Sequence, residues 1–194
     1  MRLRTFGSVA MTVALLAHTA TVMAQEESPA AEATMSPVAE AFAATFPDEI
    51  GGVSVFDIVE VFVADDPDQL DAASLPLLEQ AAAAAGVGLD AVLIGQALTV
   101  DLFDEDAEGV WIVAIHVPGM EPAAGTDLVL DLFTGSADEE LLVAGSEVAG
   151  RSVTSVTSAE DPSTEMIIYS GADTAWVVMS PSPALLEEAV SKLP

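Results

Sequence analysis

The large number of carboxylate side chains constrains how this chain can fold more than any other feature of its sequence. It carries 32 Asp and Glu residues against 4 Lys and Arg residues, a formal charge of −28. Ion pairs can neutralise few of these carboxylates, so most must lie at the surface, where water and salt screen their repulsion. Hydrophobic residues still make up 52% of the chain, whereas disordered chains combine high charge with low hydrophobicity. The sequence therefore predicts a folded core beneath an acidic surface.

This composition excludes several functions. Proteins that bind DNA or RNA need clustered Lys and Arg to displace counterions from phosphates, so we expect no nucleic-acid partner. Anionic membrane surfaces are disfavoured for the same reason. The chain contains no cysteine, which excludes disulfides, thiol nucleophiles, iron–sulfur clusters and lipid attachment at cysteine.

Residues 1–24 have the pattern of a secretory signal peptide. Arg2 and Arg4 form a charged start, residues 9–17 are apolar, and Val22-Met23-Ala24 resembles a cleavage site. The apolar run is shorter than the roughly 20 residues that span a membrane, so we expect cleavage and no span in the mature chain. The sequence thus predicts a secreted protein, periplasmic or extracellular.

Three regions follow from the composition of the chain. After the signal peptide, residues 25–44 are rich in Ala, Glu, Ser and Pro and are expected to form a flexible acidic leader. Residues 45–194 have the length of one domain. We expect a single α+β domain there.

Hydrophobic periodicity and breaker residues place the expected elements of this domain. Ser74 is expected to cap one helix that Gly86 ends, and Ser182 with Pro183 to begin the last helix. We expect helices at 74–85, 121–133 and from 183 onward, with a helical turn at 138–143. We expect strands at 53–63, 91–103, 108–117, 152–158, 165–169 and 174–179.

This order predicts helices packed on a mostly antiparallel sheet. Its first six elements match a ferredoxin-like β-α-β-β-α-β arrangement, followed by β-β-α. A faint internal repeat relates Val110-Trp111-Ile112-Val113, with its following helix, to Ala175-Trp176-Val177-Val178 and the last helix.

Three segments resemble parts of secreted or lipoprotein-type bacterial proteins that have no assigned activity. They are Pro47-Asp48-Glu49-Ile50-Gly51-Gly52-Val53, the strand segment Gly150-Arg151-Ser152-Val153-Thr154, and the ending from Ala184-Leu185-Leu186-Glu187-Glu188-Ala189 to Leu193-Pro194. The resemblance implies a compartment outside the cytoplasm and transfers no catalytic residue or cofactor.

No catalytic set emerges from the sequence. Only His116 could act as a histidine base in the mature chain, and strand alternation places it on the face opposite Trp111 and Val113. We expect it at the rim or surface, with no catalytic or cofactor-binding role. A hydrolase that uses two of the many carboxylates is the weakest alternative.

Calcium binding is the stronger alternative, because Ca²⁺ prefers clustered carboxylate oxygens. The best candidate ligands are Asp101, Asp104, Asp106 and Glu108, with Glu105 beside them in an expected acidic hairpin. An EF-hand loop beginning at Asp104 would need Glu at its twelfth position, where Ile115 stands. A second, weaker acidic cluster comprises Asp65, Asp66, Asp68 and Asp71.

These observations favour a non-catalytic secreted module that binds or assists an envelope or extracellular partner. Its carboxylates are distributed along the mature chain, a pattern typical of proteins adapted to saline surroundings, where the Debye length falls to about 3 Å at 1 M salt. The mean hydropathy of +0.50 implies apolar surface that either the core or a homodimer must bury.

Overall fold

A computed structural model describes most of the chain after residue 35. The described residues are 36–55, 58–65, 70, 72–99, 109–134, 141–159 and 165–194. The expected signal peptide and most of the expected leader lie outside them.

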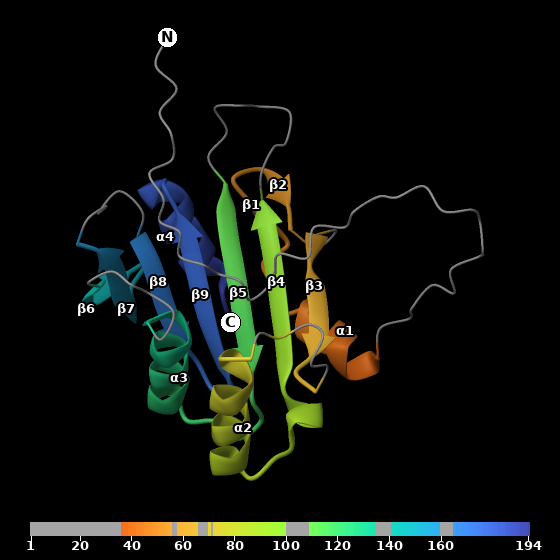
Figure 1. The fold of residues 1–194 in the computed structure, drawn as a ribbon. Helices are drawn as coiled ribbons and strands as arrows, with labels where there is room; N and C mark the ends of the chain where they lie inside the picture. The colour runs from red at the N-terminus through yellow and green to blue at the C-terminus, as the bar shows by residue number, and fades with distance from the viewer. Residues whose placement is uncertain are drawn as a thin grey trace, which may run out of the picture.

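An antiparallel sheet of seven strands forms the centre of the fold (Figure 1). Its strands in chain order are β3 (Glu60–Val63), β4 (Leu93–Thr99), β5 (Val110–His116), β6 (Leu141–Val148), β7 (Arg151–Ser158), β8 (Glu165–Ser170) and β9 (Thr174–Ser180). They are arranged as β3-β4-β5-β9-β8-β7-β6, and every neighbouring pair is antiparallel. The central pair joins distant parts of the chain, with Ile112 opposite Val178.

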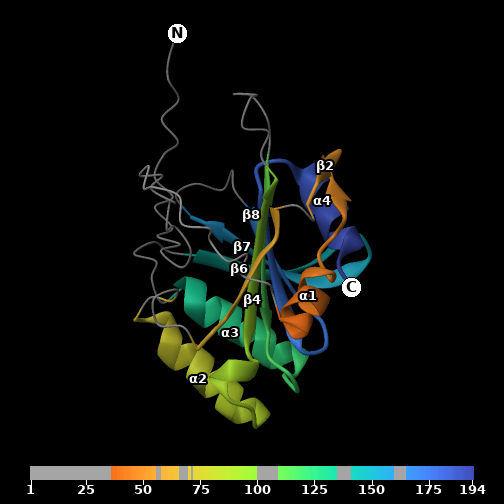
Figure 2. The same cartoon turned by 90° about the vertical axis from the view of Figure 1, so that its right-hand side faces the viewer.

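Helices cover both faces of this sheet, so the fold has three layers (Figure 2). On one face lie α2 (Ser74–Ala85) and α3 (Pro122–Thr134). On the other lie α1 (Pro37–Ala43), α4 (Pro183–Lys192) and a small hairpin of β1 (Glu49–Ile50) and β2 (Val53–Ser54). The predicted α+β class, with helices packed on an antiparallel sheet, is confirmed.

The central strands have a buried apolar core on each side. Val113, Ile115 and Val177 point toward α2 and α3, whereas Ile112, Trp176 and Val178 point toward α1 and α4. Since successive residues of a strand face opposite sides of a sheet, β5 and β9 supply apolar residues to both cores. This explains why their sequences are continuous hydrophobic runs.

Helix α1 lies within the range expected as a flexible leader. Ser36 caps it, its hydroxyl accepting a hydrogen bond from the Ala39 N–H at 3.2 Å. Phe42 is buried, and its ring packs edge-on against Phe46, with centroids 5.9 Å apart. Ser36 caps a helix whose Phe42 belongs to one of the two cores, together with Phe46. Folded structure therefore begins no later than Ser36.

Some expected elements are corrected by the structure. The single strand expected at 53–63 is two short strands in different sheets, β2 and β3. Residues 141–143, expected in a helical turn, begin the extended strand β6. The cap of α2 is Ala73, and Ser74 is a buried first residue of the helix. Gly86, with φ of +77°, ends α2 as predicted.

The ferredoxin-like order and the internal repeat are not confirmed. The strands β3 and β4, which α2 connects, are antiparallel neighbours, whereas a β-α-β crossover joins parallel strands. The two repeat segments direct their tryptophans to opposite faces, with Trp111 on the α2–α3 side and Trp176 on the α4 side.

No helix among the described residues is long and apolar enough to cross a membrane.

Candidate functional site

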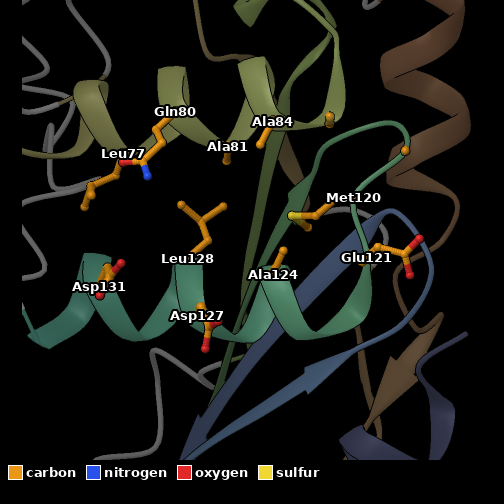
Figure 3. Close-up of a pocket in the computed structure, with 12 residues that line it drawn as sticks. Leu77, Gln80, Ala81, Ala84, Met120, Glu121, Ala124, Asp127, Leu128 and Asp131 are labelled. Atoms are coloured by element: carbon orange, nitrogen blue, oxygen red, sulfur yellow. The ribbon is translucent and has the colours of Figure 1, made fainter.

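A groove between α2 and α3 is the strongest candidate for a binding site. It has a volume of about 290 Å³, close to the lower end of the roughly 300–1,000 Å³ typical of small-molecule sites. Figure 3 shows the two helices side by side, with the lining residues drawn. The lining residues are Leu77, Gln80, Ala81, Ala84, Ala85, Gly119, Met120, Glu121, Ala124, Asp127, Leu128 and Asp131.

Small side chains create the apolar floor of the groove. Ala81, Ala84 and Ala85 come from the alanine run of α2, and Ala124 comes from α3. Leu128 projects from α3 toward α2 and is buried at the base (Figure 3). Alanine favours the helix but fills little space between the helices. The same alanine run that stabilises α2 therefore leaves room for a ligand.

Acidic side chains form the rim. Asp127 and Asp131 are exposed and lie one turn apart on α3, and exposed Glu121 immediately precedes that helix. Among the described lining residues, none is basic. Like charges at i and i+4 on a helix repel each other by a few tenths of a kcal/mol, so a cation between Asp127 and Asp131 would relieve this repulsion.

Asp173 holds the turn that forms one end of the groove. Its side-chain Oδ1 accepts a hydrogen bond from the Gly119 N–H at 2.8 Å. Its backbone N–H donates to the Met120 carbonyl at 3.2 Å, and its own carbonyl accepts from the Val117 N–H at 2.8 Å. The β8–β9 turn is thus tied to the segment that leads into α3.

Two contacts bring α3 close to the sheet. The Thr126 and Ser170 hydroxyl oxygens lie 2.9 Å apart. A Cβ at Gly125 would stand 3.2 Å from the Ala175 Cβ and 3.0 Å from the Met120 Cε. Gly125 therefore permits a close approach of α3 to the sheet.

The predicted calcium ligands Asp101, Asp104, Asp106 and Glu108 lie outside the described residues, as does Glu105. Of the second acidic cluster the structure describes only Asp65, which is exposed. The described part of the chain contains no group of three or more acidic or histidine side chains suited to hold a metal ion. Calcium binding by the 101–108 segment stays a prediction.

His116 is partly exposed at the end of β5, on the face that alternation predicts. Its Nδ1 lies 3.0 Å from the Thr174 hydroxyl oxygen, and its ring packs 5.4 Å from that of Phe42. Burial lowers the pKa of the imidazole from its ordinary value near 6.5, while the neighbouring Asp173 opposes that shift. The ring is on the face of the sheet opposite the groove.

The sequence did not predict this groove. Asp127 and Asp131 lie in the helix predicted at 121–133, and the alanine run 81–85 lies in the helix predicted at 74–85. Its role as a groove floor depends on how closely α2 and α3 approach, which local patterns do not specify.

No protein-family model matches this chain, and comparisons with curated proteins and with solved structures find no significant match.

Proposed function

We propose that this protein is a non-catalytic secreted binding module, with a surface adapted to saline surroundings, whose α2–α3 groove holds a small organic cation. The apolar floor with an acidic rim carries this proposal. A ligand that complements both parts has a compact hydrocarbon body and an ammonium group. Alkylammonium and arylalkylammonium ions have this chemistry.

The position of the charges supports a binding role. Asp127 and Asp131 are solvated and adjacent to apolar atoms, so a bound ammonium group can pair with them while its hydrocarbon part displaces water from the alanines. His116 faces the other side of the sheet, which separates the one histidine base of the mature chain from the groove.

Adaptation to salt is supported by how the described cations are used. Lys192 pairs with Glu188 at 2.7 Å, and Arg151 donates to the Leu193 and Pro194 carbonyls. Both therefore hold local structure. Screening by salt then has to reduce the repulsion among the many remaining carboxylates.

The test is an NMR titration with 2-phenylethylammonium, using 2-phenylethanol as a neutral probe of nearly the same shape. We expect the cation to shift the methyl resonances of Leu77, Met120 and Leu128, and the alcohol to bind more weakly. Equal affinity for both probes, or no shift with either, would contradict the proposal.

Two sets of variants locate the binding. Replacing Asp127 and Asp131 together by Asn should weaken binding of the cation by about two- to thirtyfold, since exposed ion pairs contribute about 0.2–1 kcal/mol each. Ala84→Leu should abolish binding by filling the floor, with no change in charge. The matched control replaces Glu40 and Glu187 by Gln on the opposite side of the molecule, and should bind like the parent.

A further inference from the structure

The hairpin of β6 and β7 differs in charge from the rest of this acidic molecule. Residues 141–159 contain only Glu147 and Arg151 as charged side chains, so the segment is neutral in a chain of formal charge −28. It is nevertheless at the surface, because residues 142–147 are all exposed. An exposed surface with so few charges on such a chain needs an explanation.

Among the described residues, strand β6 is also an open edge of the large sheet. It pairs with β7 over eight consecutive residues and lies at the end of the strand order (Figure 1). Exposed edges are usually guarded by charged side chains, Pro, a bulge or a short length. β6 contains no Pro and a single charged residue, Glu147 near its end; its register with β7 is regular, and it is eight residues long. The opposite edge strand, β3, is shorter, with four residues; β3 contacts α1, and β6 contacts α4.

Apolar side chains stand on both faces of this edge. Leu142 is 53% exposed and Val143 is 49% exposed. As successive residues of a strand they point to opposite faces of the sheet. An added strand would therefore gain an apolar neighbour on each face, besides the backbone hydrogen bonds along the edge.

We infer that β6 is the contact surface between two copies of this chain, which pair their β6 strands antiparallel about a two-fold axis. The charge of the molecule favours a second copy of the chain over a basic partner at β6. A basic partner would be attracted to the carboxylate-rich surfaces, whereas a second acidic copy meets least repulsion along the neutral hairpin. The contact is isologous, so it closes on itself and joins the two sheets into one.

This pairing should depend on salt in a characteristic direction. The hydrogen bonds and apolar contacts at β6 are local, whereas the repulsion comes from carboxylates spread over both copies. Raising NaCl to about 1 M shortens the Debye length to about 3 Å and screens that repulsion. The dimer should therefore tighten as salt is added, the opposite of a contact held by ion pairs.

Sedimentation velocity of the purified protein tests the inference, across a concentration series at low and high NaCl. We expect a monomer–dimer equilibrium that shifts toward dimer at high salt. Amide hydrogen exchange should slow along residues 141–148 as the dimer forms, while residues 60–63 at the opposite edge exchange unchanged. A protein that stays monomeric at every concentration and salt level overturns the inference.

Substitutions in β6 test whether this strand is the contact surface. Leu142→Glu combined with Val143→Glu should abolish the dimer. The matched control, Val38→Glu combined with Leu98→Glu, adds the same charge at two other exposed apolar residues and should still dimerise. If the β6 variant does not fold, Gly145→Glu replaces it, since a Cβ at Gly145 meets no atom within 4 Å. A dimer that survives folded β6 variants refutes this contact.

Discussion

Gly95 shows how one absent side chain positions a helix. A Cβ at this position of β4 would stand 2.8 Å from two atoms of the Phe46 ring and 3.0 Å from the Phe42 Cε1. Phe46 in turn packs edge-on against Trp176, with centroids 5.1 Å apart. The aromatic residues at the end of α1 therefore rest directly on the backbone of the sheet.

Gly95→Ala should destabilise the protein by about 1–3 kcal/mol, because overpacking forces these rings to move. Urea denaturation monitored by circular dichroism measures the change. Gly145→Ala is the matched control, since it also replaces a strand glycine but meets no atom within 4 Å. It should be neutral or slightly stabilising, by about 0.5 kcal/mol. Equal effects at both positions would contradict the steric argument.

Glu188 ties α4 to the β1–β2 hairpin. Its Oε1 accepts hydrogen bonds from the Lys192 Nζ at 2.7 Å and from the Gly51 N–H at 3.2 Å. The same Lys192 Nζ donates to the Glu49 carbonyl at 2.7 Å. The hydrogen bond from Lys192, and then that from Gly51, lower the pKa of Glu188 from its ordinary value near 4.5.

The lowered pKa of Glu188 determines the direction in which protein stability should change with pH. A carboxyl group whose pKa falls on folding stabilises the protein above its unfolded pKa, and that stabilisation is lost as the pH falls through the folded pKa. Glu188→Gln should therefore lower the Tm near neutral pH, and the difference from the parent should disappear in acid below the lowered pKa. Glu187→Gln, which removes a charge from the adjacent position, serves as the control. A difference that grows on acidification would contradict this assignment.

At the scale of elements, hydrogen bonds between the β8–β9 turn and the segment from β5 to α3 hold one end of the groove. Asp173 has a left-handed backbone with φ of +62° and makes hydrogen bonds to the β5–α3 segment. Asp and Asn tolerate this conformation better than other residues with a Cβ, since their side chains form local hydrogen bonds. Asp173 therefore both adopts the left-handed conformation of the turn and accepts the hydrogen bond from the Gly119 N–H.

Asp173→Ala should therefore destabilise the protein by about 1 kcal/mol or more, through the lost hydrogen bond to Gly119. Asp173→Asn keeps an acceptor oxygen and should have a smaller effect. Urea denaturation compares the two, and the methyl resonance of Met120 reports on the end of the groove. If Ala and Asn give the same stability as the parent, the turn is held by other contacts.

Glycine, proline and hydrophobic periodicity predicted the elements whose bounds depend on residues within or next to the element itself. Gly86 ends α2 as predicted, and α4 begins at Pro183 with Ser182 at the N-cap position, where the Ser182 side chain makes no capping hydrogen bond. In the helix predicted at 121–133, the apolar residues Leu128, Val129, Leu132 and Phe133 are buried. β6 escaped prediction because its Leu-Leu-Val-Ala-Gly-Ser-Glu-Val sequence lacks alternation, and both of its faces are exposed.

Non-local features explain the remaining errors. The order β3-β4-β5-β9-β8-β7-β6 depends on which distant strands meet, and alternation within a strand does not specify its neighbours. The groove is equally non-local, because it exists only where Ala81 and Ala84 of α2 come beside Ala124 of α3. The candidate site therefore could not be predicted from the sequence.

For the whole molecule, the charge predicts how stability depends on ions. We expect the Tm to rise as NaCl increases, because screening reduces repulsion among the carboxylates. Calcium chloride at matched ionic strength should add nothing further if solvent adaptation is the main role of these groups.

Thermal unfolding in NaCl, in CaCl₂ and with a chelator measures both effects. A stability that NaCl leaves unchanged would contradict the saline adaptation. A Tm raised by low calcium concentrations beyond matched salt would instead indicate specific sites, and Asp104 and Asp106 would then be the first residues to substitute.

The central pairing of β5 with β9 has a consequence for how the chain folds. On one side of this pair, β4 and β5 are consecutive strands; on the other, β6, β7, β8 and β9 follow one another as an antiparallel meander. The β5–β9 ladder joins these two parts and requires a long loop to close, with Ile112 opposite Val178. Long-range pairing slows folding because the entropy of loop closure is lost before the contacts form. We therefore expect the two half-sheets to form early and their joining to limit the folding rate.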